Sequence, residues 1–434
     1  MREIKIGLLG CGTVGGSVIQ TLQTNKDTIE QRIGAKLTLE KVLVRPVDMT
    51  RPVIKGLNTT FEFDDIINDP SIDIVVELIG GVKPAKDFII RAMDAGKHVV
   101  TANKDVIAQF GKEVFDAEAR NHIDFMFEAA VGGGIPIIMP LKRCLTANKL
   151  TEVLGIVNGT TNYMLTKMAE NGADYDSVLK EAQALGYAEA NPAADVEGLD
   201  AARKAAILAS LAFNSRVQLQ DVHVEGITKI TTADIDYAKS LGYVVKLLAV
   251  GKETKNGIDV RVHPAFLPKS HPLAGVNDVF NAIFIRGNII GEAMFFGPGA
   301  GFPTASAVVS DIIEISRDIL TDSAGRLGCT CYENKPLCPI EETRTSYYIR
   351  LLVDDKPGVL GAIAKTFGDA GVSLKSVVQT NGAKEQHAEI VVITHVGEYK
   401  RVLDAVDQLK QLPVVDEVLG MIRVHCEDGG ESNE

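Results

Sequence analysis

The sequence contains no tryptophan and only six cysteines among its 434 residues. So few thiols cannot form the disulfide framework of a small secreted protein, and they fit a reducing compartment. No apolar run approaches the roughly 18 residues of a membrane-spanning helix. The first residues, MREIKIGLLG, also lack the apolar region and cleavage site of a signal peptide. We therefore expect a cytoplasmic protein without a membrane partner.

Positive charge is scarce as well. The chain has 45 lysines and arginines against 57 acidic residues, a net charge of −12, and no basic run. Such a chain repels phosphate backbones, which argues against a nucleic-acid partner. The composition, 46% hydrophobic and 24% charged, is that of a globular protein. At about 150 residues per domain, the length predicts about three domains.

The first part of the chain alternates apolar strands with amphipathic helices, which predicts an α/β fold with a Rossmann-type parallel sheet. The predicted strands are residues 4–10, 36–45, 72–80 and 97–103, and the predicted helices are residues 14–25 and 85–96. The pattern changes near Pro136. We predict a dinucleotide-binding domain over residues 1–135, an α+β substrate-binding and catalytic domain over 136–300, and a returning loop and helix over 301–325.

The C-terminal region predicts a ferredoxin-like βαββαβ domain over residues 346–426. Its predicted strands are 347–353, 372–379, 387–395 and 417–425, and its predicted helices are 359–371 and 397–411. Residues 326–345 have no clear periodicity and form a predicted linker. The acidic segment 427–434 lacks apolar residues and is predicted to be disordered.

The predicted linker holds three clustered cysteines, Cys329, Cys331 and Cys338. Thiolates bind soft metals, but a closed tetrahedral site needs a fourth ligand and no histidine lies nearby in the sequence. Reduced thiols in a loop explain the cluster as well, because CTCYENKPLCP is rich in turn residues. The sequence assigns these cysteines no role.

Gly10, Gly12 and Gly15 form a GxGxxG pattern directly after a predicted strand and at the start of a predicted helix. The first glycine permits a tight turn, the second lets the backbone approach a pyrophosphate, and the third lets helix and strand pack closely. The helix N-terminus offers N–H groups to the anion. This context predicts a dinucleotide site, although a turn without a ligand has the same pattern.

Two basic residues follow strands at the edge of the sheet where ligands bind. Arg45 ends the second predicted strand, where an arginine can pair with the 2′-phosphate of NADP and so favours NADP over NAD. The alternative is a surface arginine at the end of a strand. Lys104 ends the segment TANK at the carboxyl edge of the sheet, where it can reach a substrate. The alternative is a solvated lysine in a loop.

The segment from Leu185 to Phe213 carries the most specific chemistry. After Asp200 the run AARKAAILASLAF is apolar nearly all round, which predicts a buried helix whose charges need partners. Lys204, one turn after Asp200, is a candidate proton donor, and Glu189, Asp195 and Asp200 are candidate ligands of a substrate ammonium group. An ordinary helix ion pair fits the same spacing.

Two further segments are polar. NGTTNY, residues 158–163, supplies Thr160 or Thr161 as a helix N-cap or lines a polar site. EAAVGGGIP, residues 128–136, offers a carboxylate and a glycine turn whose carbonyls can surround a hard cation.

In their order and spacing, these segments resemble homoserine dehydrogenase over residues 1–325. They are GLLGCGTVG, TANK, EAAVGGGIP, NGTTNY, LGYAEANPAADVEGLDAARK and FGPGAGFPTASAVVSD. DDKPGVLGAIAKTFGDAGVSL resembles an ACT domain, so the arrangement resembles the monofunctional enzyme with a C-terminal regulatory domain. Two other functions stay open: another amino-acid dehydrogenase, which the block at 185–204 disfavours, and a non-enzymatic amino-acid sensor, which the intact lysines and carboxylates disfavour.

The resemblance implies reversible reduction of L-aspartate 4-semialdehyde to L-homoserine, in the synthesis of threonine, methionine and isoleucine. NADP(H) is the preferred cofactor and NAD(H) a possible one. Lys204 is implied as the proton donor, assisted by Lys104 at the nicotinamide end, with Glu189 and Asp200 binding the substrate. The implied cofactor contacts beyond the glycines and Arg45 are Thr13, Val14, Lys104, Gly186 and Gly301.

The resemblance also implies a sodium ion, held by the carboxylate of Glu128 and the backbone carbonyls of Val131, Gly133 and Ile135. It implies a homodimer or homotetramer. Feedback by a pathway amino acid such as threonine is expected, bound at a dimer interface near the DKPGVL turn. The sequence does not fix the effector or the cofactor ratio.

Overall fold

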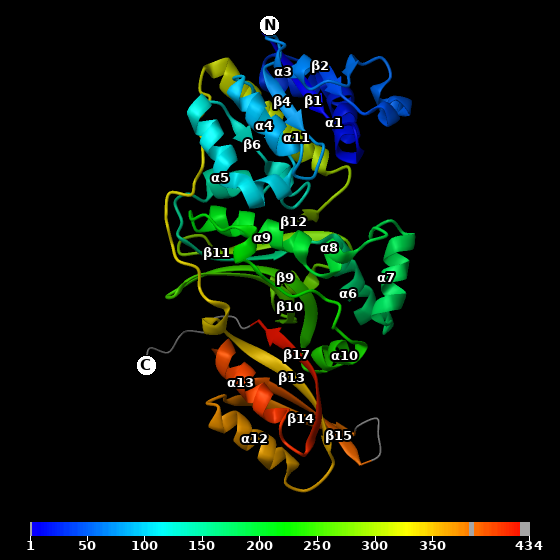
Figure 1. The fold of residues 1–434 in the computed structure, drawn as a ribbon, viewed down its shortest axis with the longest axis vertical. Helices are drawn as coiled ribbons and strands as arrows, with labels where there is room; N and C mark the ends of the chain where they lie inside the picture. The colour runs from blue at the N-terminus through cyan, green and yellow to red at the C-terminus, as the bar shows by residue number, and fades with distance from the viewer. Residues whose placement is uncertain (1, 382–385, 426–434) are drawn as a thin grey trace. The chain divides into compact units, whose positions relative to one another are not determined.

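The computed structural model describes residues 2–381 and 386–425, so Cys426 and the segment 427–434 predicted to be disordered lie outside the described residues. The chain forms two compact units, each assembled from separated stretches of sequence (Figure 1). The first unit comprises Met1–Val157, Arg203–Val222 and Phe280–Asn334, and the second comprises Asn158–Ala202, His223–Val279 and Lys335–Glu434. None of the described helices is long and apolar enough to pass through a bilayer.

The first unit contains a six-stranded parallel sheet in the order β3-β2-β1-β4-β5-β6. Its strands are β1 (Glu3–Leu9), β2 (Lys36–Leu43), β3 (Thr59–Thr60), β4 (Ile74–Glu77), β5 (His98–Thr101) and β6 (Phe125–Met126). The strand order reverses at β1, because β2 and β3 lie on one side and the later strands on the other. In open parallel sheets, ligands bind at the carboxyl ends of the strands beside such a reversal.

Helices flank this sheet, namely α1 (Thr13–Thr24), α2 (Lys26–Ile33), α3 (Asp64–Ile67), α4 (Ala85–Asp94) and α5 (Lys104–Asn121). Helix α11 (Thr304–Thr321) returns from much later in the chain and lies as a yellow ribbon among blue elements (Figure 1). Its Ile312 and Ile315 share one apolar core with Ile6 and Ile19. Each such burial contributes about 1.5–3 kcal/mol, so α11 is an integral part of the Rossmann-type domain.

The rest of the first unit consists of three antiparallel strands and one buried helix. Strands β7 (Leu150–Ile156), β11 (Phe280–Gly287) and β12 (Gly291–Pro298) pair in the order β12-β11-β7. Helix α9 (Leu199–Ala212) joins this unit from Arg203 onward. Ala205, Ala206 and Leu208 are all at most 3% exposed, which confirms the prediction of a buried helix.

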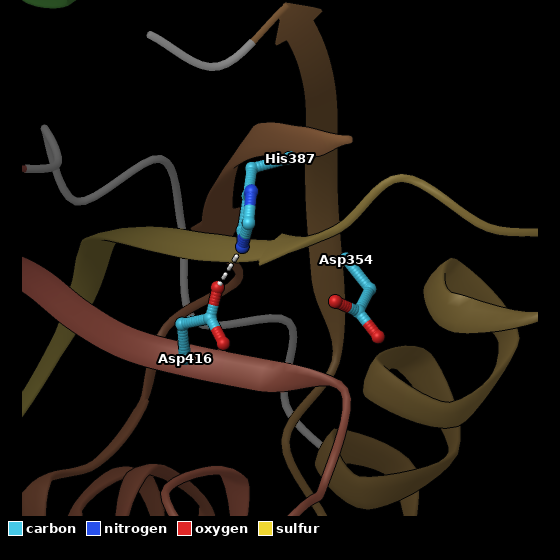
Figure 2. Close-up of side chains that lie close together, drawn as sticks. All are labelled: Asp354, His387 and Asp416. Atoms are coloured by element: carbon cyan, nitrogen blue, oxygen red, sulfur yellow. Dashed lines mark ion pairs between the residues drawn. The ribbon is translucent and has the colours of Figure 1, made fainter. Parts of the chain in front are cut away.

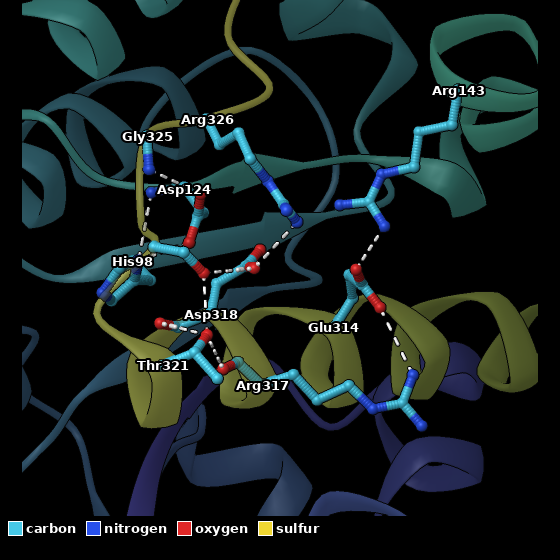
Figure 3. A network of polar contacts seen from close by, with 10 residues as sticks. His98, Asp124, Arg143, Glu314, Arg317, Asp318, Thr321, Gly325 and Arg326 are labelled. Atoms are coloured by element: carbon cyan, nitrogen blue, oxygen red, sulfur yellow. Dashed lines mark hydrogen bonds and ion pairs between the residues drawn. The ribbon is translucent and has the colours of Figure 1, made fainter.

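A polar network fixes the chain where it leaves α11 (Figure 3). The Asp318 carboxylate accepts hydrogen bonds from Ser323 at 3.0 Å and Arg326 at 3.2 Å. The Asp124 carboxylate accepts the backbone N–H of Gly325 at 2.8 Å. These bonds hold the start of the predicted linker against the first unit.

The second unit is a mixed sheet with helices. Its strands are β8 (His223–Val224), β9 (Tyr243–Thr254), β10 (Gly257–Pro268), β13 (Arg344–Asp354), β14 (Leu374–Asn381), β15 (His387–Thr394), β16 (Gly397–Glu398) and β17 (Val415–Val424). Its helices are α6 (Gly159–Asn171), α7 (Tyr175–Ala184), α8 (Ala193–Val196), α10 (Thr232–Ser240), α12 (Val359–Asp369) and α13 (Tyr399–Leu409). The strand order in this unit is β9-β10-β17-β13-β15-β14.

The predicted βαββαβ order of the C-terminal region is confirmed by β13, α12, β14, β15, α13 and β17, with the short β16 added between β15 and α13. Its sheet continues into the rest of the second unit, because β17 pairs with β10 at Ala265 and Phe266. The buried ion pair between Arg350 on β13 and Asp234 on α10, 3.0 Å apart, ties the two parts further.

The structure corrects two local predictions. The second strand ends at Leu43 rather than at residue 45. The N-cap of the helix after β7 is Asn158 rather than Thr160 or Thr161, because the Asn158 side chain accepts the backbone N–H of Thr161 at 2.9 Å. Both threonines lie inside α6.

Candidate active site

The glycine-rich turn between β1 and α1 has the geometry that its sequence predicts. Gly10 has a φ of +93°, which side chains other than glycine rarely adopt. A Cβ on Gly15 would lie 2.1 Å from the Gly10 carbonyl oxygen, so α1 approaches β1 this closely only because residue 15 is glycine. A Cβ on Gly12 would meet no atom within 4 Å. The start of α1, with Thr13 and Val14, is therefore open to a ligand, and its N–H groups suit a pyrophosphate.

Two arginines surround one buried carboxylate after β2. Arg45, 74% exposed, donates its Nε to Asp48 at 2.9 Å, and Arg51 donates its Nε to the same carboxylate at 3.0 Å. The hydrogen bond from Arg45, followed by that from Arg51, lowers the pKa of Asp48 to about 2, although burial acts in the opposite direction. One carboxylate neutralises only one of the two guanidinium groups, so this edge of the sheet stays positive. The sequence did not single out Arg51.

Lys104 begins α5 at a well-ordered edge of the sheet. At the end of β4, the fully buried Glu77 accepts a hydrogen bond from Thr101 at 2.7 Å and from the backbone N–H of Ile79 at 2.7 Å. Asn103 caps α5 by accepting the N–H of Val106 at 3.2 Å. These bonds fix the direction in which α5 leaves the sheet, and with it the half-buried Lys104.

Lys204 lies on the buried helix α9 and is 8% exposed. Its Nζ donates a hydrogen bond to the Val157 carbonyl at 2.6 Å. The neighbouring Arg203 forms an ion pair with Asp105, the residue after Lys104. Because that ion pair joins α9 to the first turn of α5, the two predicted catalytic lysines belong to one neighbourhood of the first unit.

The predicted carboxylates lie in the second unit. Asn158 donates its side-chain amide to Asp195 at 2.7 Å and to Asp200 at 2.9 Å, and the latter carboxylate is 8% exposed. The sequence presented Asn158 only as part of a polar segment, yet it brings these two acids together. Glu189 is exposed, and its backbone carbonyl accepts a hydrogen bond from the Gln183 side-chain amide at 3.1 Å.

Two predicted cofactor contacts are exposed glycines in turns. Gly186 has a φ of +76° and Gly301 a φ of +79°, so both need a residue without a side chain. A Cβ on Gly186 would meet nothing within 4 Å, which leaves its backbone accessible.

The predicted cation loop is built around the carboxylate of Glu128, which is 4% exposed. Its Oε1 accepts the N–H groups of Ile137, at 2.5 Å, and Ile138, at 2.7 Å, and its Oε2 accepts that of Met139 at 2.7 Å. Burial raises the pKa of Glu128, and these three amides oppose the rise. These bonds make the carboxylate an anchor for the residues that follow, which the sequence could not reveal.

The backbone of the same loop turns tightly. Gly132 and Gly133 have φ values of +75° and +59°, and a Cβ on Gly133 would lie 2.4 Å from the Gly299 carbonyl oxygen. The loop therefore packs directly against the segment that contains Gly301. Backbone carbonyls of such a loop, here those of Val131, Gly133 and Ile135, are ligands that a hard cation accepts.

The described residues include one group of three side chains with metal-ligand spacing, Asp354, His387 and Asp416 (Figure 2). They come from the ends of β13, β15 and β17, and His387 Nε2 lies 2.7 Å from the Asp416 carboxylate. Cys329, Cys331 and Cys338 form no such group within the described part of the chain.

Family models match most of the chain. The model described as homoserine dehydrogenase, NAD binding domain, matches residues 10–128, and the model described as homoserine dehydrogenase matches residues 136–313. A model of the ACT domain matches residues 347–414.

Full-length relatives show the same arrangement. A homoserine dehydrogenase of Synechocystis is 46% identical and covers 97% of this chain and 99% of its own length. The crystal structure of a homoserine dehydrogenase from Thiobacillus denitrificans, 41% identical, superposes with a TM-score of 0.94 over 98% of this chain and 99% of its own. A hyperthermophilic archaeal homoserine dehydrogenase in complex with NADPH is 27% identical, with a TM-score of 0.62 over 73% of this chain and 98% of its own.

The glycine turn yields a prediction with an internal control. We expect Gly15→Ala to weaken dinucleotide binding about tenfold or more, because the new Cβ pushes α1 away from β1. Gly16→Ala is the matched control, since its Cβ would meet the nearest atom, Val53 Cγ1, at an ordinary 3.6 Å. Fluorescence titration with NADPH measures both, with little protein background because the chain has no tryptophan. Equal NADPH affinity of the two variants would contradict the role assigned to Gly15.

Proposed function

Since this chain belongs to the homoserine dehydrogenase family, and so interconverts L-aspartate 4-semialdehyde and L-homoserine with a nicotinamide cofactor, we propose which of its residues perform the reaction. Lys204 is the proton donor in this proposal. The observation that carries it is the burial of the Lys204 ammonium group on α9, with Nζ 2.6 Å from the Val157 carbonyl.

Reduction of the substrate aldehyde requires one proton, which is delivered to the carbonyl oxygen. Bound NADPH supplies the hydride, and reduction of the C4 aldehyde turns its carbonyl oxygen into an alkoxide. Lys204 Nζ stabilises the developing negative charge and donates the proton, and it accepts the proton back when homoserine is oxidised. Lys104, at the start of α5, helps to position the nicotinamide end and the aldehyde.

The substrate ammonium group is assigned to Asp200, with Asp195 and Glu189 as further acidic ligands. Asn158 supports this assignment, because one amide group bonded to both Asp195 and Asp200 fixes the direction of their carboxylates. Two carboxylates with fixed directions suit an ammonium group, which has three N–H donors.

Replacement of Lys204 separates proton transfer from folding. Lys204→Arg keeps a cation that can donate to the Val157 carbonyl, but arginine does not release its proton near neutral pH. We expect kcat to fall about 10²- to 10⁴-fold, the usual contribution of a general acid, with unchanged NADPH affinity. Lys112→Ala, an exposed lysine on α5, is the control and should leave kcat unchanged. Steady-state kinetics gives kcat, and titration gives the NADPH affinity. If kcat and NADPH affinity fall together, Lys204 is a structural residue and not the proton donor.

NADP is the proposed preferred cofactor. The positive edge formed by Arg45 and Arg51 around Asp48 supports this choice, since a guanidinium pairs with the 2′-phosphate that NAD lacks. The relative bound to NADPH agrees with this proposal at the level of the family.

The cofactor preference is tested by Arg45→Ala and Arg51→Ala. Loss of one charge-assisted hydrogen bond should lower kcat/KM for NADPH about tenfold or more and leave kcat/KM for NADH unchanged. Lys55→Ala removes an exposed charge nearby and serves as the control. If kcat/KM falls equally for NADPH and NADH, the arginines stabilise the fold of this edge and do not recognise the 2′-phosphate.

A sodium ion is proposed for the loop that follows Glu128. The glycine turn at Gly132 and Gly133 supports it, because it can present the carbonyls of Val131, Gly133 and Ile135 to a hard cation. The Glu128 carboxylate is the fourth proposed ligand, and its bonds to three backbone amides fix its position.

Feedback control by an amino acid such as threonine is proposed at the turn between β13 and α12. Gly358, with a φ of +89°, is the N-cap residue of α12 and offers no side-chain cap, so the backbone N–H groups there suit a ligand carboxylate. The nearby Asp354, beside His387 and Asp416, suits the ligand ammonium (Figure 2).

The effector site is tested by Asp354→Asn in the full-length enzyme. We expect threonine inhibition to weaken at least about tenfold, because a charge-assisted bond to the effector is lost, while activity without threonine stays unchanged. Asp404→Ala, on the exposed face of α13, is the control. Unaltered inhibition in the Asp354 variant would place the effector elsewhere.

A homodimer or homotetramer is the proposed assembly. Apolar side chains on the β11–β12 hairpin support it, because Phe280, Met294 and Phe296 are 39%, 42% and 53% exposed. β12 ends the strand path at an edge, and an exposed edge with apolar side chains favours pairing with another chain.

A further inference from the structure

Cys329 and Cys331 line a pocket within the first unit. Helix α5 contributes Ile107 and Phe115 to its wall, and α9 contributes Ser210. The Cys329 side chain is exposed, whereas Cys331 is half-buried. Reagents from the solvent can therefore reach Cys329 more readily than Cys331.

The Cys329 sulfur accepts hydrogen bonds from a side chain and from the backbone. Arg216 donates its Nη2 at 2.9 Å, and the backbone N–H of Cys331 donates at 3.4 Å. Arg216 is itself held in place, since its guanidinium stacks 5.1 Å from the centre of the Phe115 ring. A fixed cation beside a sulfur stabilises the thiolate, which is the reactive form of cysteine.

The two thiols differ strongly in acidity. Hydrogen bonding from Cys331 and the charge of Arg216 lower the pKa of the Cys329 thiol, and burial opposes them. Interaction with the Cys329 thiolate, together with burial, raises the pKa of Cys331. Cys331 Sγ lies 3.8 Å from the Ser210 carbonyl oxygen.

We propose that Cys329 and Cys331 form a peroxide-reactive dithiol, in which Cys329 is oxidised first and Cys331 then closes a disulfide. The bonds at Arg216 and the accessible position of Cys329 carry this inference. It does not depend on the roles assigned to Lys104 or Lys204.

The reaction balances with hydrogen peroxide as the oxidant. The Cys329 thiolate attacks one oxygen of the peroxide, the O–O bond breaks, and Cys329 sulfenic acid forms while hydroxide leaves. Cys331 then loses its proton and attacks the Cys329 sulfur, so that an S–S bond forms and the S–O bond breaks. The dithiol loses two electrons, and the peroxide is reduced to two molecules of water once the hydroxides are protonated.

The first experiment compares alkylation rates within one molecule. Full-length enzyme is treated with limiting iodoacetamide at several pH values, and each cysteine is followed by peptide mass spectrometry. Exposed Cys144 is the internal reference. We expect Cys329 to react at least about tenfold faster than Cys144 near pH 6.5, because its thiolate persists there. Equal rates at that pH would overturn the proposal.

The second experiment follows oxidation. After peroxide treatment, the peptide that contains Cys329 and Cys331 should lose the mass of two hydrogens and regain it with a reductant. In Cys331→Ser the same treatment should leave Cys329 as a sulfenic acid, which dimedone captures. A disulfide to another cysteine, or no change at Cys329, would overturn the proposal.

Arg216→Gln tests the cause of the reactivity, with Arg326→Gln as the matched control. Arg326 precedes the thiols on the same segment and pairs with Asp318, at 3.2 Å, instead of a sulfur (Figure 3). We expect alkylation of Cys329 to slow about tenfold only in the Arg216 variant. Thermal unfolding checks that both variants fold, and equal rates in both would contradict the assigned role of Arg216.

Discussion

The burial of one ammonium group constrains the catalytic part of this protein. An uncompensated charge in the interior costs several kcal/mol, so Lys204 can be buried only where a polar partner is fixed in advance. The Val157 carbonyl, directly after β7, is such a partner at 2.6 Å. The alanines of α9 make the approach possible, because Ala205, Ala206 and Ala209 leave room for the helix to be enclosed. The end of β7, the position of α9 and the first turn of α5 are therefore linked, the last through Arg203 and Asp105.

Much of the fold follows from local patterns in the sequence. The tight turn at Gly10 and the close packing at Gly15 are backbone properties, and a pattern of glycines between a strand and a helix predicts them directly. The alternation of apolar runs likewise predicted the parallel sheet and the βαββαβ order. The resemblance of LGYAEANPAADVEGLDAARK to one enzyme family supplied the reaction, which periodicity alone could not.

The remaining features depend on contacts between distant residues. Arg51 reaches Asp48 only because a short 3-10 helix follows β2, and no period in the sequence signals that turn. Asn158 caps α6 and also bonds to Asp200, 42 residues later. The Glu128 carboxylate, predicted as a cation ligand, is bonded to three amides. The sequence does not show which polar residue caps a helix or anchors a loop, because these contacts form only in the folded chain.

The C-terminal region looks like a separate domain in the sequence, yet its contacts make it part of a larger unit. Strand β17 pairs with β10, and Arg350 and Tyr348 of β13 both bond to the buried Asp234 of α10 at 3.0 Å. Removing one partner of a buried pair costs about 3–5 kcal/mol, so these parts cannot separate freely. The turn after β13, where we propose that an effector binds, therefore follows a strand already bonded to the rest of its unit. The Arg350–Asp234 ion pair couples β13 to α10, so any displacement of β13 either moves α10 with it or breaks this buried pair.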